Sequence, residues 1–217
     1  MEQIAYVNGS FVPLSEAKVS IFDRGFLFAD GIYEVAAVLD GKLIDNASHL
    51  ARLERSVGEI ALALPESLAR IQEIQKELVE RNSLVNGMVY LEVTRGADSG
   101  RDFAFPKGDV KPTLIMFTSV KDIVNAPSAR TGIKVITVPD LRWARRDIKS
   151  VALLAQVLAK QAAAEAITAL GDTLFVSTAA AYDALSPGLK ATLETLSAVH
   201  SAIREYSSAG HSAQKRK

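Results

Sequence analysis

The chain has 217 residues, of which 48% are hydrophobic and 23% charged, as in an ordinary globular protein with room for one large or two small domains. Its 25 basic and 25 acidic side chains give a formal net charge of zero, so no excess charge attracts nucleic acid or an anionic membrane. The sequence contains no cysteine, which excludes disulfides and thiolate sites, and no apolar run approaches membrane-spanning length, so we expect a cytoplasmic protein without membrane contact.

Two β-hairpins are expected in the first 44 residues. Asn8-Gly9 and Asp40-Gly41 each separate two stretches that are rich in apolar residues, and such dipeptides supply the positive φ angles of a tight two-residue turn. The polar segment between the hairpins, up to Asp30, is expected to form a loop. The predicted strands are 4–7, 11–12, 31–39 and 42–44.

Apolar residues at three- and four-residue spacing predict two amphipathic helices after the second hairpin. Asn46 or Ser48 can cap the first helix, which runs to about Leu62. Pro65 opens the second helix, which runs to about Arg81. β-Branched and aromatic residues between Gly and Pro breaks predict three further strands, 87–94, 113–120 and 133–138, and an alanine-rich helix is expected over 151–166.

Lys149 lies between the cluster Arg145-Arg146-Asp147 and an apolar helix start. Partial burial and neighbouring cations favour the neutral form of a lysine, which can attack a carbonyl and form a Schiff base. Taken alone, a lysine near a helix start is more often a solvated surface group. The rest of the sequence therefore has to decide between these two interpretations.

Four motifs follow one another in the order and spacing of a known family. They are Phe22 to Val35 (FDRGFLFADGIYEV), His49 to Leu53 (HLARL), Val93 to Gly96 (VTRG) and Asp147 to Ser150 (DIKS). Together they closely resemble fold-type IV pyridoxal-phosphate enzymes, and D-amino-acid aminotransferases are the nearest match. The resemblance extends to about residue 166.

The resemblance implies an aminotransferase of the D-amino-acid/branched-chain class that transfers an amino group to a 2-oxo acid. By the same resemblance, Lys149 would hold pyridoxal 5'-phosphate as a Schiff base and move the substrate proton. Arg52 would bind the cofactor phosphate, a role that suits a planar guanidinium with paired donors. Tyr33 would project toward the substrate and Arg101 would help to hold its carboxylate. A homodimer is implied, and no metal.

One motif departs from the family pattern. The carboxylate trap of D-amino-acid aminotransferases that use Arg-x-His has histidine at its third position, but this chain has Arg101-Asp102-Phe103. Phe103 has no hydrogen-bond donor for a carboxylate, and Asp102 would repel one if it pointed inward. D-Amino acids, other α-amino acids and amines therefore stay open as substrates.

After residue 166, the acidic partner of the pyridine nitrogen and the turns of the phosphate site that the family would supply are not found. Residues 170–200 instead resemble a fragment of taurine dioxygenase-type iron and 2-oxoglutarate enzymes. Those enzymes need a His-x-Asp/Glu iron motif, and His49, His200 and His211 each have alanine at the second following position. We therefore interpret the chain as a chimera joined near residue 167.

The predicted fold class is α+β, with a small α/β sandwich-like N-terminal domain and the start of an incomplete second domain that ends in helices. The expected division is a small domain 1–120, an interdomain connection 121–131, a truncated cofactor-domain segment 132–166 that carries Lys149, and an unrelated, mostly helical tail 167–217.

Three functions stay open after this reasoning. The first is an aminotransferase whose turnover the missing C-terminal part impairs. The second is an inactive, aminotransferase-like remnant that acts as a dimerisation domain. The third, iron-dependent oxygenation, is the least favoured because its ligand motif is missing.

Overall fold

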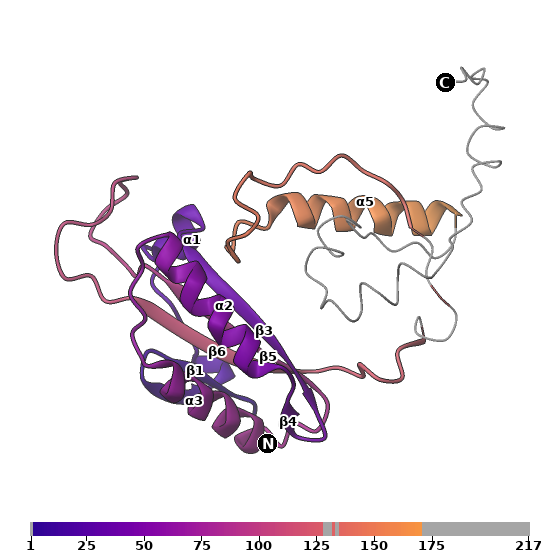
Figure 1. The fold of residues 1–217 in the computed structure, drawn as a ribbon, viewed down its shortest axis with the longest axis horizontal. Coiled ribbons are helices and arrows are strands. Elements are labelled where there is room, and N and C mark those ends of the chain that lie inside the picture. The colour runs from indigo at the N-terminus through magenta and orange to yellow at the C-terminus, as the bar shows by residue number, and fades with distance from the viewer. Residues whose placement is uncertain (1, 128–131, 133–134, 171–217) are drawn as a thin grey trace. The chain divides into compact units, whose positions relative to one another are not determined.

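The computed structural model describes residues 2–127, 132 and 135–170, which belong to one compact unit. Pairs of strands alternate with pairs of helices over the first 120 residues, and one long helix follows (Figure 1). In chain order the elements are β1 (Ile4–Val7), β2 (Ser10–Pro13), η1 (Leu14–Glu16), α1 (Arg24–Phe28), β3 (Gly31–Leu39), β4 (Lys42–Leu43), α2 (Asn46–Glu59), α3 (Leu68–Arg81), β5 (Gly87–Thr94), β6 (Thr113–Val120) and α5 (Leu154–Leu170).

The strands form one antiparallel sheet in the order β2-β1-β6-β5-β3-β4. Both hairpin turns are confirmed, since Asn8-Gly9 and Asp40-Gly41 have positive φ at both positions. Helices α2 and α3 cover one face of the sheet, and the predicted α+β class is confirmed (Figure 1). Among the residues that the structure describes, no helix is long and apolar enough to cross a membrane.

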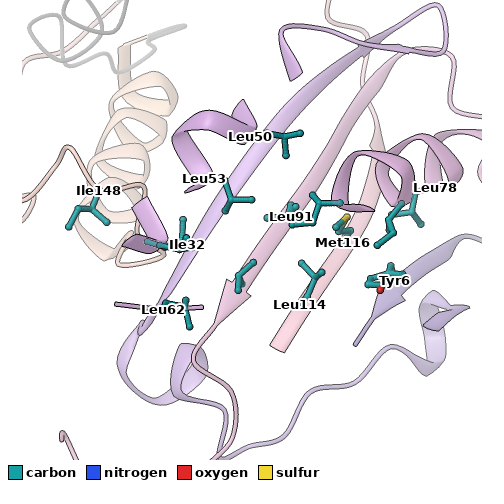
Figure 2. Packing of buried hydrophobic residues seen from close by; sticks show 14 residues of the cluster. Tyr6, Ile32, Leu50, Leu53, Leu62, Leu78, Leu91, Leu114, Met116 and Ile148 are labelled. Carbon is teal, nitrogen blue, oxygen red and sulfur yellow. The ribbon is translucent and has the colours of Figure 1, made fainter. Parts of the chain in front are cut away.

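The hydrophobic core lies between that sheet face and the two helices (Figure 2). Alternate residues of the central strands point into it, because successive side chains of a strand face opposite ways. The helices contribute their apolar stripes to the same layer. The largest fully buried hydrophobic members include Tyr6, Ile32, Leu53, Ile71, Ile74, Leu78, Leu91, Leu114 and Met116.

Both helix starts differ from the sequence prediction. Helix α3 begins at Leu68 rather than at Pro65, because the Ser67 side chain accepts a hydrogen bond from the Arg70 backbone N–H at 3.2 Å and so caps the helix. Asp45 occupies the N-cap of α2, where Asn46 or Ser48 was expected. Asn46 instead donates its side-chain amide to Gln75 of α3 at 2.8 Å, which ties the two helices together.

Three further predictions need correction. Of the strand expected over 133–138, residues 135–138 are described and form no strand, because no described strand lies beside them to complete a ladder. Helix α5 begins at Leu154 rather than at residue 151, since residues 149–151 pair with β3. The loop expected up to Asp30 contains two short helices, η1 and α1.

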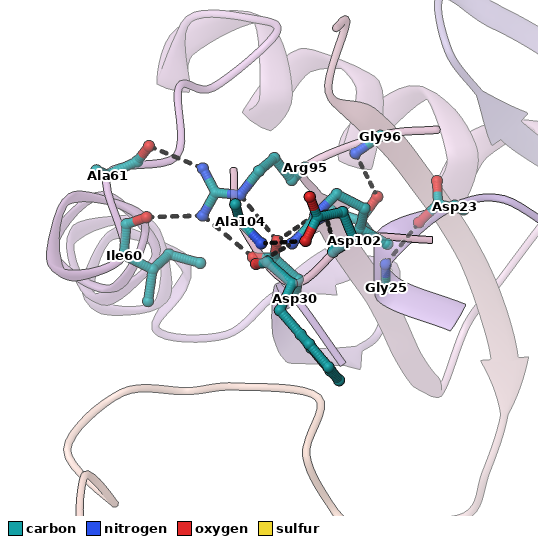
Figure 3. Close-up of polar contacts among 12 residues, drawn as sticks. Asp23, Gly25, Asp30, Ile60, Ala61, Arg95, Gly96, Asp102 and Ala104 are labelled. Carbon is teal, nitrogen blue, oxygen red and sulfur yellow. Dashed lines mark hydrogen bonds and ion pairs between the residues drawn. The ribbon is translucent and has the colours of Figure 1, made fainter. Parts of the chain in front are cut away.

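An ion cluster fixes the start of β3 to neighbouring elements (Figure 3). The Asp30 carboxylate accepts hydrogen bonds from Arg24 of α1 and from Arg95, which follows β5, each with a 2.8 Å contact. Arg95 also donates to the carbonyls of Ile60 and Ala61 after α2, at 2.7 and 3.0 Å. Burial alone would raise the pKa of Asp30, but the two arginines outweigh it and hold this pKa below its ordinary value.

Because the side chain of Leu53 is fully buried in the core, we expect its truncation to lower the stability of the fold strongly. Leu53→Ala should lower the free energy of unfolding by about 3 kcal/mol, because it removes apolar surface that folding buries and leaves a cavity in its place. Leu141→Ala is the matched control, since Leu141 is 74% exposed, and its effect should stay within about 0.5 kcal/mol. Urea denaturation measures both, and equal effects would contradict the described core.

The ion cluster predicts a pH-dependent loss of stability in Asp30→Asn. The variant leaves two buried guanidinium groups without their carboxylate and should lose about 3 kcal/mol at neutral pH. Because folding lowers the pKa of Asp30, this contribution is present above the unfolded pKa of about 4 and disappears as the pH falls through the folded pKa.

Urea denaturation between pH 7 and pH 3 tests that cluster. The difference between wild type and Asp30→Asn should shrink toward the acid end. Glu73→Gln is the control, because Glu73 pairs with Arg70 on an exposed helix surface and should matter little. A difference that does not change with pH would contradict the role given to the Asp30 charge.

Candidate active site

Residues 149–151 attach to the open edge of strand β3. The backbone N–H of Tyr33 donates to the carbonyl of Lys149 at 3.0 Å, and the N–H of Val151 donates to the carbonyl of Gly31 at 3.2 Å. The edge is available because β4 pairs only with the last two residues of β3. The result is an antiparallel bridge with Ile32 opposite Ser150.

This register decides where the Lys149 side chain points. With Ile32 opposite Ser150, Lys149 lies opposite Tyr33, and directly opposed residues share a face of the sheet. The Nζ atom of Lys149 donates to the Tyr33 hydroxyl at 3.0 Å and lies 4.4 Å from the centre of its ring. Ile148 points the other way into the core, where it is 5% exposed. A buried neighbour therefore anchors the lysine.

Lys149 and Tyr33 line a cavity of about 110 Å³. Gln156 is a lining residue, and its buried Oε1 atom has no hydrogen-bond partner among the described residues. Small-molecule sites usually measure about 300 to 1,000 Å³, and the described residues thus enclose only part of such a site. The remaining lining residues are Arg142, Trp143, Arg146, Ile148, Ser150, Ala152 and Leu153.

Arg52 lies on α2 and forms a paired contact with Glu34 of β3. Its Nε and Nη2 atoms donate to the two Glu34 carboxylate oxygens, both at 2.7 Å, and His49 Nδ1 lies 2.9 Å from the same carboxylate. Burial would raise the pKa of Glu34, but the bonds from Arg52 and His49 outweigh it and lower this pKa. The same pairing raises the pKa of Arg52, so the Arg52 side chain stays positively charged.

Arg52 does not line the cavity, but it lies near the segment that carries Lys149. Ser56 follows Arg52 by one helical turn and so lies on the same flank of α2. The backbone N–H of Lys149 donates to the Ser56 hydroxyl at 3.4 Å. The Arg52 side chain is 40% exposed, and its Nη1 atom donates to none of the described residues, so it can still bind a further oxyanion.

Arg101 contacts two aromatic rings, and no described contact joins it to Lys149 or Tyr33. Its guanidinium carbon is 5.2 Å from the ring centres of both Phe28 and Phe103. Arg24 donates to the carbonyls of Asp102 and Phe103, at 2.7 and 3.1 Å, and so ties down the same loop. The structure thus brings Lys149 and Tyr33 together but does not place Arg101 beside them.

Sequence reasoning predicted β5 as a strand and named no site residue on it. The structure places an aromatic stack beside Tyr33, with ring centres 5.8 Å apart for Tyr33 and Tyr90 and 4.9 Å apart for Tyr90 and Phe117. The Tyr90 hydroxyl donates to the Glu92 carboxylate at 2.8 Å. The alternation of residues along this strand was the available signal, because Tyr90 and Glu92 share the face that turns away from the core.

Nothing among the described residues indicates a metal site, since no group of three or more His, Asp or Glu side chains could hold an ion there. The segment 170–200, compared above with a taurine dioxygenase-type fragment, lies outside the described residues apart from its first residue. The matches to known proteins reported next do not support that resemblance.

The family model for amino-transferase class IV matches residues 31–182, a span that passes the junction expected near 167. D-alanine aminotransferase from Staphylococcus aureus (strain MSSA476) is 41% identical over 179 residues, which cover 80% of this chain and 62% of that protein. The chain therefore spans less than two thirds of the length of this relative.

Solved structures show the same fold. The branched-chain amino acid aminotransferase from Escherichia coli has a TM-score of 0.65 at 16% identity and covers 81% of this chain and 58% of its own. A hypothetical aminotransferase from Mycobacterium tuberculosis in a PLP-bound form has a TM-score of 0.63 at 21% identity, with 81% and 62% covered. The family match over most of the sequence, on a fold of this kind, shows that the chain belongs to the class IV aminotransferase family.

Proposed function

We propose that this chain is a pyridoxal-phosphate-dependent aminotransferase of the D-amino-acid/branched-chain class, which transfers an amino group from an amino acid to a 2-oxo acid. One observation carries the proposal: the primary amine of Lys149 is held on the Tyr33 hydroxyl at 3.0 Å, at the wall of a cavity. The family and the relatives named above support this reaction class. As part of the proposal we expect a homodimer in the cytoplasm.

The chemistry of the described side chains fits pyridoxal phosphate. The aldehyde of the cofactor needs a primary amine, which Lys149 supplies. Its phosphate needs cationic donors, and the Nη1 atom of Arg52 donates to none of the described residues. The Oε1 atom of Gln156, which has no partner in the described part of the chain, would accept a hydrogen bond from a ligand. When bound, the cofactor supplies an electron sink for negative charge at the substrate α-carbon.

The residues of this chain would divide the remaining work. Lys149 would carry the proton at its Nζ atom, and Tyr33 would orient that atom through its hydroxyl. Arg52, kept charged by Glu34, would bind phosphate oxygens. Arg101 would hold the substrate carboxylate. Since Arg101 does not line the cavity beside Lys149 in the described chain, we expect it to act in the site of the other subunit of the proposed homodimer.

Lys149→Ala tests the proposal directly. Wild-type protein incubated with pyridoxal phosphate and reduced with borohydride should retain the cofactor on Lys149, as peptide mass spectrometry would show, whereas the variant should lose the modification. Lys160→Ala is the control, because Lys160 is an exposed lysine on α5. Equal labelling of wild type and Lys149→Ala would refute the proposal, and complete absence of labelling would favour the inactive remnant.

Tyr33→Phe separates cofactor attachment from turnover. The variant keeps the ring stack with Tyr90 but loses the hydroxyl that positions Nζ. Attachment to Lys149 should persist, while the rate of amino transfer should fall on the order of 100-fold, the lower end of the range for a positioned proton-transfer group. Single-turnover kinetics measure the rate, and an unchanged rate would show that Tyr33 has no such role.

A further inference from the structure

Glu92 lies in one row with the two central site residues. Tyr33 is directly opposite Glu92 in the β3–β5 register, just as Lys149 is opposite Tyr33 at the β3 edge. The three side chains therefore share the sheet face that turns away from α2 and α3. Neighbouring strands are about 4.8 Å apart, so Glu92 lies two strand spacings from Lys149. A ligand that is bound at Nζ of Lys149 and extends over Tyr33 therefore points toward Glu92.

The Glu92 carboxylate has no counterion among the described residues. Its Oε2 atom accepts the hydrogen bond from Tyr90, but its Oε1 atom has no partner there, and no cation lies within ion-pair distance. Burial raises the pKa of Glu92, and the nearby Asp23 raises it further, against the lowering effect of the Tyr90 bond. The group therefore has one oxygen available to a hydrogen-bond donor from a ligand.

Asp23 places a second carboxylate near Glu92. It caps α1 by accepting the Gly25 backbone N–H at 2.8 Å, and it is only 2% exposed (Figure 3). Its Oδ2 atom is buried and has no partner in the described part of the chain. Helix α1 lies tightly on the end of β5, because a Cβ atom built on Gly25 would be 2.3 Å from a side-chain carbon of Thr94.

Asp23, which is buried, and Glu92, which is half-buried, differ from the acids that pair with arginine. Asp30 and Glu34 are each neutralised by arginine, whereas no described cation pairs with Asp23 or Glu92. Two acidic groups without a counterion create a negative potential on the face that a ligand of Lys149 must approach. A like charge brought into such a place is strongly disfavoured, and a hydrogen-bond donor is favoured.

We propose that Glu92, with Asp23 beside it, determines substrate specificity by excluding side chains that carry a second carboxylate and by favouring isosteric side chains that donate a hydrogen bond. The substrates are thus amino acids with a neutral side chain, and asparagine is preferred to aspartate as amino donor. This inference rests on the proposed aminotransferase function for its reaction, although the charge selection itself is a property of ligand binding.

The test compares succinate with succinamate, which differ only in a carboxylate and an amide. NMR titrations of the full chain at pH 8, with pyridoxal phosphate present, should show succinamate binding at least tenfold more tightly than succinate in wild type. Glu92→Gln keeps an acceptor for Tyr90 and should remove most of this preference. Glu73→Gln, on the exposed surface of α3, should keep it.

The matching kinetic readout is the ratio of kcat/KM for asparagine and aspartate, measured with both enantiomers, which should change in the same direction in Glu92→Gln. An unchanged ligand preference in Glu92→Gln, or no binding of either acid to wild type, would overturn the inference. Failure of the proposed function is separate, because it would show as no cofactor on Lys149 whatever the titrations give. Unfolding curves confirm that the variants fold.

Discussion

The short bridge between residues 149–151 and the edge of β3 is the constraint on which the candidate site depends. Two backbone hydrogen bonds and the burial of Ile148 fix the direction of Lys149. A shift of this pairing by one residue would turn the lysine into the helix-covered face and Ile148 out of it. Because one side of the bridge belongs to the core, the core itself selects the register that brings Lys149 to Tyr33.

The acidic residues of the domain fall into two groups with different consequences. Asp30 and Glu34 are buried together with arginines, and they join α1, α2 and the central strands into one framework. Asp23 and Glu92 have no such partners in the described residues, and Glu92 lies in the row that leads to Lys149. Buried charges without counterions are costly to folding, and a site that discriminates ligands by charge is one setting in which such groups persist.

The family motifs contain structural residues as well as candidate site residues. Arg24, Asp30 and Arg95 come from two of the motifs, yet their contacts hold backbone segments in place and do not reach the cavity. Tyr33 and Lys149 come from two motifs as well, and these two meet in space. A motif read from sequence therefore indicates the family, whereas its contacts decide which members hold the fold and which face a ligand.

Local sequence signals determined much of the structure of residues 2–120. Asn8-Gly9 and Asp40-Gly41 fixed two hairpins, and the apolar spacing fixed α2 and α3, because turns and amphipathic helices depend on residues close together in the chain. The strand expected over 133–138 failed at its described residues, because a strand also needs a neighbour, which local pattern cannot supply.

The sequence by itself also singled out Lys149 and Tyr33, through resemblance, but it could not say that they touch. They are 116 positions apart, and their contact depends on the free edge of β3 and on the burial of Ile148. Glu92 was missed for the same reason, since only the pairing of β3 with β5 sets it opposite Tyr33. Local chemistry thus determined the elements and the candidate residues, while long-range backbone pairing decided which side chains share one face.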